Sequence, residues 1–244
     1  MKGNFSIQSD KYVRYRPTYP APLYDFILSI VNGKHYVWDC GTGNGQVAYQ
    51  LANYFEKVFA TDISQSQLDN ALQNEKIEYS AQPAEKTNFP DDFFDLIVVA
   101  QAIHWFDFNR FYSEVKRTLK DNGILVVIGY ARLQISAELD TIIAHLYYNV
   151  VGPFWDKERR YIDENYRTIP FPFKEIEAPA IENVFDWTFE HLKGYLETWS
   201  AVKHFIRERG YNPVDHVYEE LKKNWGIADT RRIKFPILLR VGKK

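Results

Sequence analysis

The residues best suited to chemistry lie in a glycine-rich stretch from Asp39 to Gly45 and at Asp62. Gly41 and Gly43 lack a Cβ atom, so the backbone can turn tightly there and come close to a ligand. A strand pattern precedes the stretch and a helix pattern follows it, so the turn leaves free amides at a helix N-terminus. Asp62 lies 21 residues after Gly41 (62 − 41), where an acid in nucleotide-binding α/β folds accepts hydrogen bonds from ribose hydroxyls. The spacing predicts a site for an adenosine-containing cofactor; the alternative is an ordinary glycine-rich turn.

The third position of the dinucleotide fingerprint distinguishes between cofactors. That fingerprint requires a third glycine, which allows close packing of helix on strand, and the chain has Gln46 at this position. The pattern Asp-x-Gly-x-Gly-x-Gly, from Asp39 to Gly45, instead resembles motif I of the class I S-adenosylmethionine-dependent methyltransferases. An NAD-binding oxidoreductase and a non-catalytic cofactor-binding protein remain the alternatives of other classes.

Strands and helices that could hold this loop alternate along the chain. Apolar runs such as Phe93–Ala100 and Ile124–Gly129 are typical of strands buried on both faces. Strands that alternate with helices of this length imply parallel βαβ units with right-handed crossovers. We therefore expect an α/β, Rossmann-like, seven-stranded, mostly parallel, doubly wound sheet. The expected strands are 35–40, 57–61, 76–80, 93–100, 124–129, 184–189 and 235–242, and the expected helices are 21–32, 45–54, 65–73, 108–119, 135–150, 190–208 and 213–225.

The chain is expected to form a single domain, 1–244, with four parts. Residues 1–22 form an N-terminal arm, and residues 35–130 form the cofactor-binding core. The stretch 131–180, rich in proline, aromatic and charged residues after its first helix, is expected to be a helical and irregular substrate cap inserted after the fifth strand. Residues 181–244 are expected to supply strands and helices that complete the sheet. Ligands of open α/β sheets bind at the carboxyl edge, so we place the cap there.

The methyltransferase resemblance extends beyond the glycine loop. The segment Asp95–Asp107, with Ala102-Ile103-His104-Trp105 at its centre, is similar to the fourth strand and following loop of trans-aconitate and juvenile-hormone-acid methyltransferases. The arm pattern from Tyr12 to Pro20 and the segment Tyr195–Ser200 fit a methyltransferase type 11 subgroup. The resemblance covers nearly the whole chain. It specifies cofactor and fold and says little about the substrate.

That resemblance assigns roles around S-adenosylmethionine. The loop binds the methionine part, Asp62 the ribose hydroxyls, and Ile63 flanks the adenine. The arm would fold over the cofactor as a lid, or else strap the sheet edge. The cofactor-binding residues it implies are Tyr12, Arg16, Asp39, Gly41, Thr42, Gly43, Asp62, Ile63, Ala84, Glu85, Ala100 and Gln101.

Three residues after the fourth strand are the catalytic candidates: Gln101, His104 and Trp105. His104 could act as a general base, because an unperturbed pKa near 6.5 suits proton abstraction at neutral pH. It could instead hold a substrate carboxylate, or be a structural loop histidine. Trp105 is expected to be a pocket wall, and its face could pack against a sulfonium.

The acceptor is expected to be a small molecule. Methyl transfer gains most from alignment and exclusion of water, and a carboxylate needs no base, so the lack of an acid–base pair favours carboxyl O-methylation. Carbon or hydroxyl methylation of a lipid-like or quinone-like acceptor is the alternative. Ala100–Ile103 replaces the Asn-Pro-Pro-Tyr type of motif, which disfavours an amino target in nucleic acid. Candidate arginines for a carboxylate are Arg132, Arg159, Arg160 and Arg207.

Composition limits the remaining classes. A formal net charge of −2 over 244 residues argues against a general nucleic-acid or membrane-surface binder. The single cysteine, Cys40, suits a reducing cytosol. No secretory signal, membrane span or metal-ligand spacing is apparent. We therefore expect a cytoplasmic monomer or homodimer without a metal.

Overall fold

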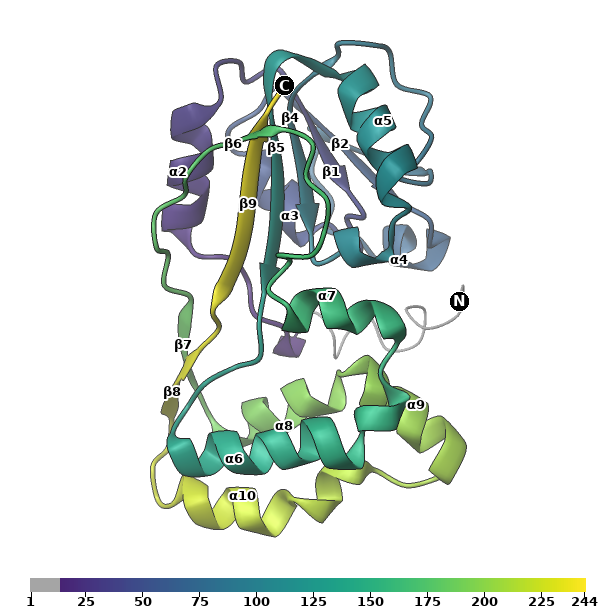
Figure 1. The fold of residues 1–244 in the computed structure, drawn as a ribbon. Coiled ribbons are helices and arrows are strands. Elements are labelled where there is room, and N and C mark those ends of the chain that lie inside the picture. The colour runs from purple at the N-terminus through teal and green to yellow at the C-terminus, as the bar shows by residue number, and fades with distance from the viewer. Residues whose placement is uncertain (1–13) are drawn as a thin grey trace.

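A seven-stranded sheet forms the centre of the computed structural model, which describes residues 14–244 (Figure 1). The strand order is β3-β2-β1-β4-β5-β9-β6. Strands β1 to β5 pair in parallel, whereas β9 runs antiparallel to both β5 and β6. The strands are β1 (Tyr36–Cys40), β2 (Lys57–Asp62), β3 (Ile77–Ala81), β4 (Phe94–Ala100), β5 (Leu119–Tyr130), β6 (Lys174–Glu175) and β9 (Ile237–Lys243). This is the predicted Rossmann-like, mostly parallel sheet.

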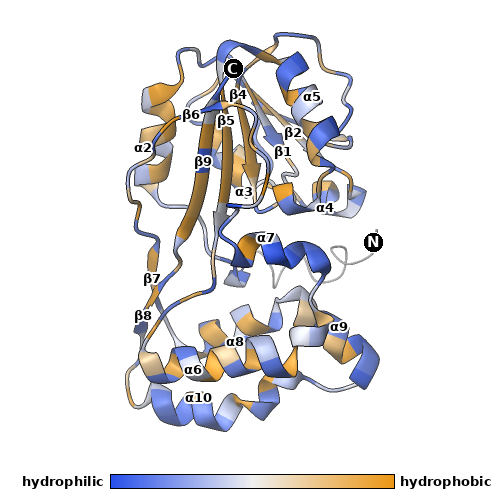
Figure 2. Cartoon of the chain, viewed as in Figure 1, coloured by the Kyte–Doolittle hydropathy of each residue, from blue (hydrophilic) through white to orange (hydrophobic). Residues whose placement is uncertain are grey.

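Alternation along the strands divides the apolar side chains between the two faces. Val37 packs in one core cluster and Trp38 in another, and Val98 and Val99 divide in the same way. Helices α2 (Ala21–Ile30) and α3 (Gln46–Leu51) cover the first face, and α5 (Phe108–Thr118) covers the second. Apolar colouring follows β4, β5 and β9 along most of their length (Figure 2). The sheet is therefore doubly wound, as its buried strands predict.

A helical cap lies beyond one end of the sheet (Figure 1). Its helices are α6 (Ala137–His145), which continues as a π-helical turn over Leu146–Val150, α7 (Arg160–Asp163), α8 (Phe189–Glu197), α9 (Ser200–Arg209) and α10 (Tyr218–Trp225). Helices α6, α8, α9 and α10 share one apolar cluster, which includes Leu139, Leu192, Val202 and Leu221. The cap is thus built from two segments of the chain, 137–163 and 189–225.

The expected role of residues 181–244 is therefore wrong in part. Only β9 of this segment joins the sheet; α8, α9 and α10 pack against α6, because their apolar faces meet that helix. The expected strand 184–189 appears as β7 (Val184–Trp187), and it pairs with β8 (Arg231–Lys234) in a separate antiparallel ribbon. The seventh strand of the sheet is β6, which lies within the stretch expected to be cap.

Several helix boundaries also differ from expectation. The helix expected over 190–208 divides between α8 and α9 because Trp199 has an extended backbone (φ −61°, ψ 136°). The helix expected over 65–73 is only α4 (Gln65–Asp69). The helix expected over 213–225 begins as a 3-10 turn, Pro213–His216. No helix in residues 14–244 is long and apolar enough to cross a membrane.

Candidate active site

The glycine loop joins β1 to α3 and has three glycines with left-handed backbones. The φ angles are +72° at Gly41, +57° at Gly43 and +79° at Gly45, which side chains with a Cβ atom rarely adopt. A Cβ on Gly41 would lie 2.6 Å from Ala102 Cβ, and one on Gly45 would collide with Tyr79 Oη. A Cβ on Gly43 would meet nothing within 4 Å. Gly41 and Gly45 therefore serve packing, and Gly43 is the glycine that faces open space.

The amides of this loop are largely used inside the protein. Gly41 and Thr42 both donate to the Thr61 carbonyl, at 2.8 and 2.9 Å, and Gly45 donates to the Thr42 carbonyl at 3.0 Å. Gly43 donates to Asp62 Oδ2 at 2.9 Å. A loop whose amides are occupied in this way is not a phosphate cradle, which needs free amides directed at the ligand. This geometry agrees with the absence of the third fingerprint glycine.

Asp39 links the glycine loop to the first turn of α3 by hydrogen bonds. It is fully buried, and its Oδ2 accepts hydrogen bonds from Thr42 Oγ1 at 2.6 Å and Ala48 N at 2.9 Å. Burial raises the pKa of this carboxyl to about 7, although both hydrogen bonds oppose the shift. Oδ1 is buried with no hydrogen-bond partner among the described residues. Burial likewise raises the pKa of the neighbouring Cys40 thiol, which is an inert core side chain here.

Asp62 ends β2 beside the loop, and Ile63 follows it. Asp62 accepts one backbone amide on each oxygen, from Gly43 at 2.9 Å and from Ser64 at 2.8 Å. Each carboxylate oxygen has capacity for a further donor. Ile63 exposes 68% of its surface next to this acid. An acid with spare acceptor capacity, an exposed apolar face and the open space at Gly43 together fit a ribose and a planar base, so these residues fit an adenosine cofactor.

The loops after β3 and β4 complete this side of the site. Ala84 is buried, and Glu85 accepts a hydrogen bond from the Asp107 amide at 3.0 Å. Ala100 ends β4, and Gln101 follows with a φ of +55°. This strained backbone is held by hydrogen bonds from Gln101 N to the Ile128 carbonyl, at 2.9 Å, and from its Nε2 to the Tyr130 carbonyl, at 3.2 Å. Strain of this kind persists where the surroundings fix it, and it clusters at functional sites.

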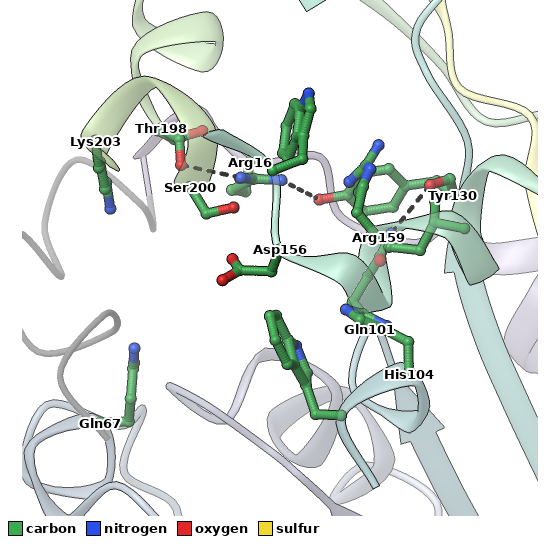
Figure 3. Close-up of a pocket in the computed structure, with 13 residues that line it drawn as sticks. Arg16, Gln67, Gln101, His104, Tyr130, Asp156, Arg159, Thr198, Ser200 and Lys203 are labelled. Carbon is green, nitrogen blue, oxygen red and sulfur yellow. Dashed lines mark hydrogen bonds between the residues drawn. The ribbon is translucent and has the colours of Figure 1, made fainter. Parts of the chain in front are cut away.

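A pocket lies between this edge of the sheet and the cap (Figure 3). Its walls come from the end of β4, the end of β5, the arm, the 3-10 turn Lys157–Arg159 and α9. Aromatic rings form part of the lining, and three cations face one acid. The lining residues are Arg16, Gln67, Gln101, His104, Trp105, Tyr130, Trp155, Asp156, Arg159, Ile162, Thr198, Ser200 and Lys203.

His104 is buried on the sheet side of the pocket, on a 3-10 turn (Ile103–Trp105). Burial, and to a smaller extent the Arg159 charge, lower the pKa of its imidazole to about 3. Its Nδ1 is buried without a hydrogen-bond partner among the described residues. The imidazole is therefore neutral at neutral pH, which is poorly matched to a general base working near pH 7.

Arg159 is held in place by its Nε atom. Nε donates to Tyr147 Oη at 2.7 Å, and Tyr147 Oη in turn donates to Asp163 Oδ1 at 2.6 Å. The guanidinium lies 4.8 Å from the Trp155 ring centroid. Neither Nη nitrogen has a hydrogen-bond partner within residues 14–244. The outer edge of the guanidinium is therefore free to bind an anion.

Arg16 and Lys203 add two more cations. Arg16 connects the sheet to the cap: its Nη1 donates to Tyr130 Oη at 3.3 Å and its Nη2 to the Thr198 carbonyl at 3.1 Å (Figure 3). Partial burial, and then the Arg16 charge, lower the pKa of Lys203. The preceding Tyr15 packs against Gly194 of the cap. Its ring lies so close that a Cβ atom on Gly194 would be 2.6 Å from it.

The predicted site residues thus fall into two adjoining groups. Motif-derived residues line the loop region, while Gln101, His104, Trp105 and Arg16 line the pocket. Tyr12 lies outside the described residues, and Tyr15 and Arg16 of the arm contact the cap. Among the four candidate arginines, Arg159 alone lines the pocket: Arg132 stacks over Tyr148 at 5.3 Å, and Arg160 and Arg207 are exposed. No cluster of potential metal ligands occurs in the part of the chain that the structure describes.

The sequence reasoning missed Asp156, Lys203 and Ser200. Asp156 and Lys203 lie in segments without a recognisable motif, and only the fold brings them to the pocket. Thr198 and Ser200 also line the pocket, and the resemblance that covers Tyr195–Ser200 assigns them no role.

Comparison with known proteins relates this chain to methyltransferases. Residues 38–127 match the Methyltransf_11 family, described as a methyltransferase domain. A Dictyostelium discoideum protein named as a methyltransferase is 34% identical over 98% of this chain and 94% of its own length. A Saccharomyces cerevisiae protein named as an S-adenosylmethionine-dependent methyltransferase is 24% identical over 90% of this chain and 89% of its own. A solved structure of a type II methyltransferase from Anaeromyxobacter dehalogenans has a TM-score of 0.86 and 34% identity, and covers 94% of this chain and 98% of that one.

Proposed function

The chain belongs to the class I S-adenosylmethionine-dependent methyltransferases, and from this membership we propose that it methylates a carboxylate oxygen of a small organic acid. The observation that carries the proposal is the set of cations in the pocket: Arg16, Arg159 and Lys203 face a cavity in which Asp156 is the single acid among the described lining residues. Arg159 has a free outer edge, and guanidinium groups match the planar geometry of carboxylates. We do not base the proposed carboxyl methylation on a similarity to trans-aconitate methyltransferases.

The residues at the glycine loop and at the end of β2 would bind the cofactor. When bound, S-adenosylmethionine supplies an electrophilic methyl group on a sulfonium sulfur. Asp62 would hold the ribose hydroxyls, Ile63 would flank the adenine, and the open side of Gly43 would receive the methionine part. Gln101 stands at the end of β4, between this region and the pocket.

The pocket residues would then bind and orient the acceptor without moving a proton. A carboxylate is ionised at neutral pH, so it needs no general base, and a neutral His104 suits this reaction. An oxygen that accepts an N–H from Arg159 keeps a second lone pair for attack. Trp105, Tyr130 and Trp155 line the pocket and help to exclude water.

A product test distinguishes the chemistry. The purified protein is incubated with methyl-labelled S-adenosylmethionine and a panel of aliphatic and aryl carboxylic acids, and the products are exposed to mild base. Carboxyl methylation gives an ester that base hydrolyses. A base-stable product would overturn the proposal and favour carbon or hydroxyl methylation of a lipid-like or quinone-like acceptor.

Two neighbouring arginines provide a matched pair for the same assay. Arg159→Ala removes a hydrogen bond to a charged group, worth about 1.5–3 kcal/mol, so kcat/KM for an acid should fall roughly 10- to 100-fold. Arg160→Ala removes an exposed charge next to Tyr161 and should change kcat/KM by less than about twofold. Equal losses in the two variants would contradict the assignment of Arg159.

A further inference from the structure

Asp156 occupies a position where an aspartate ordinarily stabilises its own backbone. It precedes the 3-10 turn Lys157–Arg159 with an extended backbone (φ −65°, ψ 146°), and an aspartate there usually accepts a hydrogen bond from an amide two or three residues on. Asp156 makes no such bond. Its carboxylate is directed instead into the open centre of the pocket (Figure 3). The side chain therefore faces the ligand cavity rather than its own turn.

The carboxylate has no polar partner within residues 14–244. Its Oδ2 is buried and makes no hydrogen bond. No described lysine or arginine nitrogen lies within ion-pair distance of it, although Arg159 is only three residues away; Nε of that arginine is used by Tyr147. A buried carboxylate oxygen without a partner destabilises a fold, and native proteins keep few such atoms without a functional reason.

The remaining charges in the pocket indicate which donor Asp156 would accept. Arg16, Arg159 and Lys203 give the other walls a positive charge, which repels an ammonium group and attracts a carboxylate. A neutral hydroxyl meets no such repulsion and can donate to a carboxylate oxygen. The pocket thus has places for two different groups of one acceptor, an anion and a hydrogen-bond donor.

We propose that Asp156 accepts a hydrogen bond from a hydroxyl group of the acceptor, and hence that the enzyme methylates hydroxy carboxylic acids in preference to the parent acids. This inference rests on the proposed carboxyl methylation. A site built to bind a hydroxyl discriminates strongly against an analogue without it, because its own polar group is then left unpaired. Asp156 is a specificity-determining residue in this assignment, and the methyl group still goes to the carboxylate.

Matched acids test the proposal directly. Pentanoic, octanoic and 3-phenylpropanoic acids are each measured beside their own hydroxy derivatives, with the hydroxyl moved along the chain or ring. In the wild-type protein, at least one hydroxy acid should have a kcat/KM tenfold or more above that of its parent. In Asp156→Ala this ratio should fall to within twofold of one, because the hydroxyl loses its acceptor. Glu158→Ala, an acid on the same turn that does not line the pocket, should keep the wild-type ratio.

The outcomes separate the two proposals. If parent and hydroxy acids are methylated equally well, or if Asp156→Ala keeps the wild-type ratio, the hydroxyl inference fails and carboxyl methylation stands. If no acid in the panel is methylated, carboxyl methylation fails and the hydroxyl inference falls with it.

Thermal stability provides a second readout, independent of turnover. Because the Asp156 carboxylate makes no hydrogen bond or ion pair in the described chain, Asp156→Ala should melt at the same temperature as the wild type or higher. Active-site groups often carry such a cost in stability. A clear fall in Tm would show that Asp156 supports the fold, and would overturn its assignment to the acceptor.

Discussion

The environment of His104 leads to a prediction about stability as well as chemistry. The folded protein holds this imidazole in a buried site beside the Arg159 charge, with a pKa of about 3. In the unfolded chain a histidine titrates near pH 6.5. Between these values the unfolded state binds one more proton than the folded state at this position. The stabilising contribution of a neutral His104 is therefore complete above pH 6.5 and is lost as the pH falls toward 3.

The size of the effect follows from the two pKa values. Each pH unit below 6.5 removes about 1.4 kcal/mol from the free energy of unfolding, so His104 costs about 2 kcal/mol at pH 5 relative to pH 7.5. Other groups titrate in this range, and a variant is needed to isolate the histidine. His104→Asn retains polar atoms without a titration near neutrality. We expect the wild-type protein to lose about 2 kcal/mol more than this variant between pH 7.5 and pH 5.

Urea unfolding followed by tryptophan fluorescence at several pH values measures this difference. The exposed His216 provides the control, and His216→Asn is expected to follow the wild-type curve. If His104→Asn loses as much stability as the wild type over this range, the imidazole is not buried in its neutral form and the argument against a general base fails. The pH–rate profile gives a separate check: turnover of a carboxylate acceptor should show no inflection near pH 6.5 from this residue.

Three further predictions concern the site. Asp62→Ala should weaken binding of S-adenosylhomocysteine by about 1–3 kcal/mol, measured by calorimetric titration, because the ribose hydroxyls would lose their acceptor; unchanged affinity in a folded variant would contradict the placement of the ribose. Gly45→Ala should destabilise the protein more than Gly43→Ala in urea unfolding, because both positions have positive φ but only at Gly45 would a Cβ collide with Tyr79; equal losses would refute the packing role of Gly45. Tyr147→Phe should raise KM for a carboxylic acid with a smaller change in kcat, because it removes the hydrogen bond that fixes Arg159; an unaltered KM would mean that this bond does not position the guanidinium.

The conformation of the glycine loop and the position of the acids beside it were predictable because their information is local in the chain. Glycines with positive φ, an acid just before them and an acid at the end of the next strand are read directly from sequence spacing. In the structure Asp39 accepts hydrogen bonds from Thr42 and Ala48, and Asp62 accepts one from Gly43, so both acids contact the loop or the helix that follows it, as that spacing implies. The buried strands were equally readable, since continuous apolar runs bounded by turns leave few alternatives. The structure also shows that the glycines have different roles. Gly41 and Gly45 pack against side chains from elements distant in the sequence, and Gly43 faces open space.

The packing of the cap helices was less predictable, because the sequence pattern of an amphipathic helix does not specify the surface that its apolar face contacts. Helices α8 to α10 have apolar faces that could cover the sheet or another helix, and the hydrophobic effect is not directional. The same uncertainty affected the strand at 184–187, which pairs with β8 in a ribbon instead of joining the sheet. Short strands such as β6 have no periodicity of their own to indicate them.

By itself, the sequence determined the fold class, the cofactor loop and the class of enzyme, because each depends on neighbouring residues with fixed backbone requirements. The pocket between the sheet and the cap was decided by the tertiary structure. It brings Arg16 within hydrogen-bond distance of Thr198, 182 positions away along the chain, and sets Asp156 and Arg159 across from the end of β4. Contacts of this range arise from packing two cap segments over the sheet edge, and no local pattern encodes them. Packing also decided properties that sequence spacing does not encode. His104 is neutral, the outer edge of the Arg159 guanidinium is free, and Asp156 Oδ2 is buried without a hydrogen-bond partner.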